Sequence, residues 1–164
     1  SRVTGPTRRA ERSNLRIRKA RLSDLQGILQ LYAQLFARTD QAEKNAETIL
    51  PAHRTAFSEI DRDPNTSLLV AESSGHVLGT LSVTIVPNLS HRGRHWAIIE
   101  NVVVDKGVQR ASVGTALVQH AIALAQERDC FRIVLSSSVH RKDSHRFYES
   151  LGFEAYGYSF KKHL

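Results

Sequence analysis

The sequence predicts a single α/β domain in which helices flank a mixed sheet. Its 164 residues fit one domain of ordinary size. Apolar side chains recur at strand spacing and at helix spacing in the order β-α-α-β-β-β-α-β-α-β. The fourth predicted strand, residues 95–104, ends in three valines, and apolar side chains on both faces are typical of a strand inside a sheet. We therefore expect the following helix to cross over near the centre of the sheet.

The first two predicted elements lie within residues 15–36. Residues 15–20 alternate apolar and polar side chains enough for a short strand. Ser23 followed by Gln26 is a capping-box pattern, which indicates the start of a helix. Apolar side chains at helical spacing extend that helix to Phe36.

The middle of the chain predicts a second helix and a hairpin. The helix covers residues 51–60, with proline in its first turn, where a missing N–H costs little. Residues 67–71 and 77–86 have the composition of strands. The Ser-Ser-Gly-His sequence at 73–76 is a turn signal that joins these strands into a hairpin.

The last third predicts two helices and two strands after residues 95–104. A broad apolar face runs through residues 113–128 and indicates a helix that packs on the sheet. Residues 131–135 form the next strand. A short helix over 144–150 ends before Gly152, and residues 153–160 are expected to close the chain as a strand.

Composition excludes several classes of protein. A single cysteine, Cys130, leaves no internal disulfide framework and no all-cysteine metal site. No apolar run approaches the roughly 20 residues of a membrane span, and no secretion signal is recognisable. We therefore expect a soluble, cytoplasmic protein without a membrane partner. Basic residues are scattered and 7% of residues are aromatic, so no nucleic-acid partner is expected.

The net charge of +7 attracts anions, whether nucleic acid, acidic substrates or a phosphorylated cofactor. Residues 1–14 carry four arginines and one glutamate, and so hold +3 of this charge. This segment is polar and has no apolar periodicity, so we expect a disordered basic tail before a domain at 15–164. A nucleic-acid-binding arm is the alternative for the tail.

The segment from Glu100 to Thr115 carries the first functional signal. A predicted strand leads through a short turn into a helix with small residues at its start. Such a helix start presents unpaired N–H groups and the positive end of the helix dipole, which together bind phosphate. Ala111, Ser112 and Gly114 are small enough to let a pyrophosphate approach the backbone. A strand–helix junction with small residues used only for packing is the alternative.

The segment S-H-R-F-Y-E-S-L-G-F at 144–153 completes a resemblance to the GNAT superfamily of N-acetyltransferases. The cofactor loop of that family reads approximately Q/R-x-x-G-x-G/A after a strand ending in valine. Residues 109–114 here read Q-R-A-S-V-G and follow Val104. The C-terminal signature of the family, F-Y-x-x-x-G-F, is matched in full between Phe147 and Phe153. The resemblance covers the element order from about residue 24 to the C-terminus.

The resemblance implies a GNAT-like, mostly antiparallel mixed sheet in which two central parallel strands splay apart. It implies acetyl-CoA as cosubstrate in that splay, with backbone amides holding its pantetheine and pyrophosphate. A homodimer is also expected, because many relatives are dimeric. The residues expected to bind the cosubstrate are Val102, Val103, Val104, Gln109, Arg110, Ala111, Ser112, Val113, Gly114, Thr115, Ser144 and Phe147.

Tyr148 and Glu100 are the catalytic candidates. A tyrosine with a pKa near 10 is protonated at neutral pH, so Tyr148 is the expected general acid for the departing thiolate; a packing aromatic is the alternative. The resemblance to small-amine acetyltransferases implies that Glu100 acts as a base through water. An ordinary carboxylate lies about six pKa units below an alkyl ammonium, a mismatch of about 8 kcal/mol, which favours orientation and a water relay over direct abstraction. A solvent-facing glutamate is the alternative.

These inferences predict direct acetyl transfer to the primary amine of a small acceptor, with no enzyme-bound intermediate and no metal. A polyamine would be repelled by a chain of charge +7, so an amine that also carries an anionic group is favoured. The histidines and arginines within 91–95 and 140–146 are candidates to contact it. Segments 140–148 and 158–164 look like those of aminoalkylphosphonate acetyltransferases. The alternatives are a peptide or protein N-acetyltransferase and a non-catalytic acyl-CoA-binding sensor.

Overall fold

The computed structural model describes residues 14–36, 48–108 and 110–164, and the first thirteen residues of the expected tail lie outside this range. Five strands form one sheet in the order β1-β2-β3-β4-β5. Neighbours from β1 to β4 are antiparallel, and β5 is parallel to β4, which confirms the mixed, mostly antiparallel sheet. The strands are β1 (Arg16–Lys19), β2 (Thr66–Ser73), β3 (His76–Val86), β4 (Trp96–Val104) and β5 (Ile133–Leu135).

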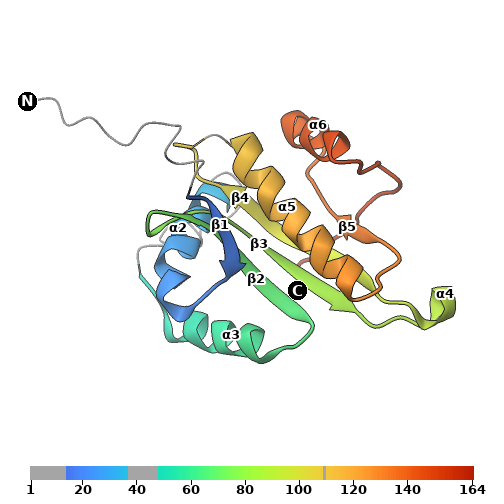
Figure 1. Cartoon of the computed structure of the whole chain (residues 1–164), viewed down its shortest axis with the longest axis horizontal. Helices are drawn as coiled ribbons and strands as arrows, with labels where there is room; N and C mark the ends of the chain where they lie inside the picture. The colour runs from blue at the N-terminus through green and yellow to red at the C-terminus, as the bar shows by residue number, and fades with distance from the viewer. Residues whose placement is uncertain (1–13, 37–47, 109) are drawn as a thin grey trace, which may run out of the picture.

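The helices cover both faces of this sheet. Helix α5 lies across one face, and α6 lies beside the N-terminal end of α5 (Figure 1). Helices α2 and α3 pack on the other face. The helical segments are η1 (Leu22–Asp24), α2 (Leu25–Phe36), α3 (Pro51–Arg62), α4 (Ser90–Gly93), α5 (Arg110–Glu127) and α6 (Lys142–Ser150).

Alternation along the strands produces two apolar cores. In β2, Leu69 and Ala71 join the core under α5, whereas Leu68 and Val70 join the core under α2 and α3. Successive strand side chains point to opposite faces, so a strand covered on both sides reads as a continuous apolar run. The predicted hairpin between β2 and β3 is present, and both Ser74 and Gly75 have positive φ there.

The start of the first helix differs from the predicted capping box. Helical structure begins at Leu22, so Ser23 lies inside η1 rather than before the helix. The carboxylate that accepts the free backbone N–H of Arg21 is that of Asp24, at 2.7 Å. Ser23 and Gln26 match the capping pattern two positions too late, because a short 3₁₀ turn precedes α2.

The predicted C-terminal strand is wrong. Residues 153–164 form neither helix nor strand, and the side chains of Tyr158 and Phe160 are more than nine-tenths exposed. The segment has the alternating aromatic residues of a strand, but it forms no backbone ladder with β5, which is only three residues long. A strand needs such a ladder to be stable, and Gly157 in the middle of the segment weakens it further.

We expect Asp24→Ala to lower the free energy of unfolding by about 2 kcal/mol at pH 7. The nearly buried Asp24 carboxylate accepts two bonds from Arg18, at 2.7 and 2.9 Å, and joins β1 to the start of α2. Arg18 holds the pKa of Asp24 below its ordinary value, so the stabilisation is present above about pH 4 and is lost as the pH falls further. Urea unfolding at pH 7 and pH 3 measures both effects.

The matched control is Asp143→Ala, which removes an exposed i,i+3 pair with Arg146 and should change stability by less than about 0.5 kcal/mol. Equal losses of stability in the two variants at pH 7 would contradict the role assigned to Asp24.

Candidate active site

The two parallel strands part at the centre of the candidate site. Pairing of β4 with β5 runs from Ala97 opposite Ile133 to Ile99 opposite Leu135. There β5 ends, whereas β4 continues to Val104. Beyond Ile99, the strand ladders among the described residues join β4 to β3 alone. This is the splay that the sequence predicts, and β4 supplies an unpaired strand edge to it.

A β-bulge in β4 lies at the point where the strands part. Between the pairs Ser82–Glu100 and Thr80–Val103, β4 has two residues opposite one residue of β3. Asn101 lies in this interval with φ of 53°, a left-handed conformation that asparagine tolerates better than most residues. Asn101 was not predicted from the sequence as a site residue, although an asparagine within an apolar strand could have indicated the bulge.

The bulge determines which backbone groups face the gap. Val103 turns its carbonyl toward Gly79 of β3, and Asp105 donates its N–H to Leu78 O at 2.8 Å. Because hydrogen-bonding groups alternate between the two sides of a strand, those of Val104, and of Val102 next to the bulge, face the side where β5 has ended. Of the three predicted valines, these two can pair with an extended ligand, whereas Val103 is bonded toward β3 and buries its side chain.

The loop after β4 delivers the start of α5 to the same end of the sheet. The Asp105 carboxylate accepts the N–H of Gly107 at 2.8 Å, and Lys106 donates its N–H to the Gln34 side chain of α2 at 3.2 Å. Helix α5 then begins at Arg110 with no acidic residue in its first turn. Its unpaired N–H groups and positive dipole end suit a phosphate.

The residues predicted in this loop and helix start fall into three groups. Gln109 lies outside the described residues. Arg110 and Ala111 contribute the first backbone positions of α5. Ser112 and Thr115 are half-buried, while Val113 is buried in the core under α5. The backbone at the helix start is therefore the part of this segment that can bind a pyrophosphate.

Gly114 faces α6 rather than open space. A Cβ atom at this position would lie 3.1 Å from Cζ of Phe147, closer than ordinary contact. The missing side chain therefore lets α6 pack against the start of α5, and Phe147 makes that contact. A substitution at Gly114 would displace Phe147, so loss of ligand binding in such a variant could not be assigned to a phosphate clash alone.

Tyr148 lies next to this contact. Its ring packs edge-on against Phe147 and Phe153, with centroids 5.1 and 5.8 Å apart, and it lies against the core under α5. Burial raises the pKa of Tyr148 above its ordinary value of 10, with a smaller opposing effect from Arg141. Its hydroxyl is thus protonated at neutral pH, and it forms no hydrogen bond within the described residues. Ser144, four residues earlier on α6, is half-buried.

Glu100 projects from the other face of β4. It pairs with Ser82, it is exposed, and its carboxylate forms no ion pair among the described residues. Ile99, the preceding residue, points into the core under α5, so Glu100 points away from that core. No hydrogen bond joins Glu100 to Tyr148. Tyr148 packs against the core under α5 and Glu100 points away from it, so the two candidates lie toward opposite faces of the sheet.

Two of the histidine candidates are engaged elsewhere. The His91 ring stacks on Phe131 at 3.8 Å, and His145 bonds through Nε2 to the carbonyl of Ser138 at 2.8 Å. The described part of the chain holds no cluster of three or more His, Cys, Asp or Glu side chains that could bind a metal. Burial raises the pKa of Cys130, which favours the thiol over the reactive thiolate.

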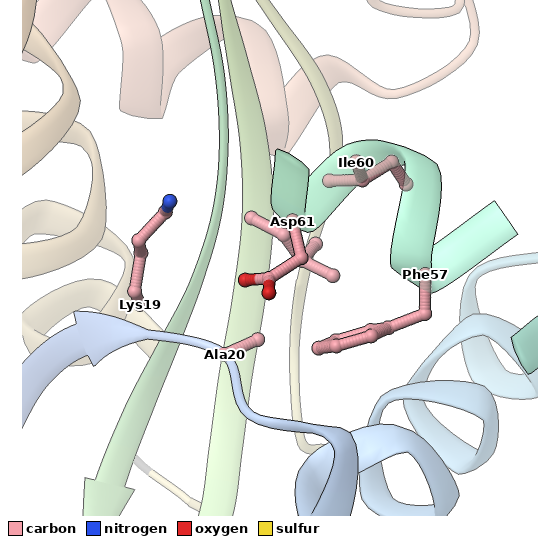
Figure 2. A pocket seen from close by; sticks show the side chains of 6 residues that line it. Lys19, Ala20, Phe57, Ile60 and Asp61 are labelled. Atoms are coloured by element: carbon pink, nitrogen blue, oxygen red, sulfur yellow. The ribbon is translucent and has the colours of Figure 1, made fainter. Parts of the chain in front are cut away.

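A shallow hollow elsewhere does not compete with this site. It lies between α3 and the end of β1. Figure 2 shows Phe57 and Ile60 of α3 facing Ala20, with Lys19 and Asp61 at the rim. The hollow is the outer part of the core under α3, and its lining contains no helix N-terminus. No helix in the described part of the chain has the length and apolarity needed to cross a membrane.

Comparison with known families confirms the fold and the class of site. Residues 26–153 match the model of the acetyltransferase (GNAT) family, so the chain belongs to this family of acyl-CoA-dependent N-acyltransferases. A crystal structure from Bacillus halodurans C-125, described as a transcriptional regulator, superposes with a TM-score of 0.81 and 33% identity. That alignment covers 92% of this chain and 99% of the other.

Two curated relatives are acetyltransferases with small acceptors. The glucosamine 6-phosphate N-acetyltransferase of Trypanosoma brucei brucei is 33% identical over 91 residues, which are 56% of this chain and 60% of that protein. The aminoalkylphosphonate N-acetyltransferase of Salmonella typhimurium is 29% identical over 114 residues, 69% of this chain and 73% of that protein. The matched segments therefore span about three fifths to three quarters of these relatives.

Proposed function

We propose that this chain transfers an acetyl group from acetyl-CoA directly to the primary amine of a small, anionic acceptor. The observation that carries the proposal is the unpaired edge of β4 beyond Ile99, at the same end of the sheet as the start of α5 and Tyr148. An extended pantetheine arm can add to that edge as a short strand does, while the helix start binds the pyrophosphate.

Tyr148 would supply the proton that the reaction needs on sulfur. In the transfer, the amine nitrogen forms a bond to the carbonyl carbon as the bond from that carbon to sulfur breaks. The leaving thiolate takes the phenolic proton. Because burial raises the pKa of Tyr148, this proton is held throughout the physiological pH range.

Glu100 would act on the amine from the open face of the sheet. Its exposed carboxylate can attract and orient an ammonium group, and water can carry the released proton to it. Water reaches Glu100 because no helix core covers the residue. Asn101, adjacent in the bulge, is also exposed and can contribute an amide hydrogen bond to the same acceptor.

The anionic nature of the acceptor is supported by charge and by the relatives. The chain has a formal charge of +7, which attracts anions and repels polyamines. The glucosamine 6-phosphate and aminoalkylphosphonate acetyltransferases act on amines that carry a phosphate or phosphonate. A cytoplasmic homodimer is part of the proposal, and the exposed aromatic residues Tyr158 and Phe160 offer apolar area for an interface.

Two alternatives stand beside this proposal. A peptide or protein N-acetyltransferase would act on terminal or lysine amines, and the open face around Glu100 could admit a peptide. A sensor that binds acyl-CoA without turnover is favoured by one observation, the description of the Bacillus halodurans structure as a transcriptional regulator. Both alternatives use the same acyl-CoA site: the first differs from the proposal in its acceptor, and the second in having no turnover.

Release of coenzyme A thiol from acetyl-CoA should distinguish these functions. We expect turnover with glucosamine 6-phosphate or an aminoalkylphosphonate, and kcat/KM about tenfold or more below that value with glucosamine, spermidine or an N-terminal peptide. Preference for the peptide would support the first alternative. Saturable acetyl-CoA binding without turnover of any amine would support the sensor.

Tyr148→Phe should lower kcat by about 100-fold or more, because it removes the proton donor and leaves the ring. The affinity for acetyl-CoA should stay within about twofold, since the Phe147 and Phe153 contacts persist. In the native enzyme, deprotonation of Tyr148 should not lower kcat at pH values below about 10. Steady-state kinetics from pH 6 to pH 10 measure both effects.

Tyr158→Phe is the matched control, because it removes the same hydroxyl from an exposed tyrosine and should leave kcat unchanged. An unchanged kcat in Tyr148→Phe as well would remove Tyr148 from the chemistry.

A further inference from the structure

We propose that Arg132 binds the anionic group of the acceptor, on the same face of the sheet as Glu100. The inference rests on the proposed function and deepens it by assigning the preference for an anionic amine to one side chain. It concerns the start of β5, at the opposite end of the β4–β5 pair from the acyl-CoA gap.

The strand register places Arg132 on the face of Glu100. Ala97 is fully buried toward α5, so Trp96 and Glu100, one and three residues away, point to the other face. Ala97 pairs with Ile133, and its N–H donates to the carbonyl of Arg132 at 3.0 Å. The guanidinium carbon of Arg132 lies 5.3 Å from the centre of the Trp96 ring, which confirms that the two side chains share this face.

Within the described residues, neither helix-covered core extends over this face between Arg132 and Glu100. The side chains around them are half-buried, mix apolar groups with hydroxyls and belong to neither core. A small acceptor could lie on them without displacing a helix. They are Ser82, Thr84, Ile98 and Val134.

Aromatic rings hold the guanidinium but leave its hydrogen-bond donors available. The Arg132 guanidinium carbon lies 5.3 Å from the Trp96 and Phe131 ring centres and 5.8 Å from that of Tyr156. Such contacts use the charge and the flat face of the group, whereas its five N–H donors lie in its plane. Arg132 forms no ion pair among the described residues. A positioned, unpaired guanidinium suits a phosphate or phosphonate, which it can bind through two parallel hydrogen bonds.

Three of the side chains first expected to contact the acceptor are already engaged. Arg94 is paired with Asp129 at 3.1 Å, and the His91 ring is stacked on Phe131. Arg146 is paired with Asp143 on the exposed side of α6. Arg132 therefore differs from these three side chains, since it faces the open surface beside Glu100 without an acidic partner.

The spacing along β4 indicates the size of the acceptor. Four residues separate the level of Arg132, beside Trp96, from Glu100, which corresponds to about 13 Å between Cα atoms. The two long side chains shorten this separation, so an acceptor whose amine and anion are several bonds apart can reach both. The amine and carboxylate of an α-amino acid are too close together to do so. A sugar phosphate, whose amine and phosphate are several bonds apart, fits this spacing.

Kinetics of Arg132→Ala and Arg132→Lys test the inference. For glucosamine 6-phosphate, Arg132→Ala should raise KM about tenfold or more with kcat nearly unchanged, and Arg132→Lys should raise it less. The KM values for acetyl-CoA and for unphosphorylated glucosamine should not change. Arg62→Ala, which removes the same charge from the distant helix α3, is the matched control and should behave as the native enzyme. An equal change of KM for glucosamine with and without phosphate, or no change for either, would overturn the inference.

Fluorescence gives a readout that does not need turnover. Trp96 is the sole tryptophan of the chain, so its emission reports directly on the side chain that contacts Arg132. Glucosamine 6-phosphate and inorganic phosphate should change this emission saturably in the native protein but not in Arg132→Ala. If the native protein turns over no anionic amine, the proposed function fails. The inference about Arg132 itself fails if phosphate titrates both proteins alike or neither.

Discussion

The candidate site depends on one extra residue in β4. The bulge at Asn101 reverses the alternation of the strand, so the backbone groups of Val104 turn away from β3 at the level where β5 has already ended. A buried polar backbone group needs a hydrogen-bond partner, and here an extended ligand can supply it. Without the bulge the same groups would be bonded within the sheet.

Packing between α5 and α6 couples the start of α5, the proposed phosphate site, to Tyr148, the proposed acid. Gly114 allows the Phe147 ring to approach α5, and Tyr148 follows Phe147 in the same short helix. The position of the Tyr148 hydroxyl is therefore determined by a contact that contains no polar atom. The F-Y-x-x-x-G-F pattern reflects this arrangement, because Phe153 packs on the other edge of the Tyr148 ring. The rings of Phe147 and Phe153 thus hold the Tyr148 ring, which carries the hydroxyl, in place.

Elements with strong local patterns could be predicted from the sequence. The helix over Pro51–Arg62, the hairpin at Gly75 and the apolar strand before α5 follow from spacing, turn residues and burial on both faces. The C-terminal strand could not be predicted, because its existence depends on a partner strand rather than on its own alternation. The resemblance located Tyr148, Glu100 and the helix start, and their roles remain proposals.

Features that arise only from contact between distant segments could not be predicted from the sequence. Gly114 was expected beside a phosphate, yet it faces a ring 33 residues further along the chain. Arg132 is one of many scattered basic residues in the sequence, and only the register of β5 on β4 places it beside Trp96. Sequence spacing indicates which residues are neighbours on one helix or strand, whereas a binding site combines residues from several helices and strands.

Hydrogen exchange with and without coenzyme A tests the central claim most directly. If the ligand adds to the free edge of β4, the amides of Val102 and Val104 and those of the first turn of α5 should exchange more slowly when it is bound. The amides around the hollow at Phe57 should not change. Slower exchange at that hollow, with Val102, Val104 and the start of α5 unaffected, would contradict the account.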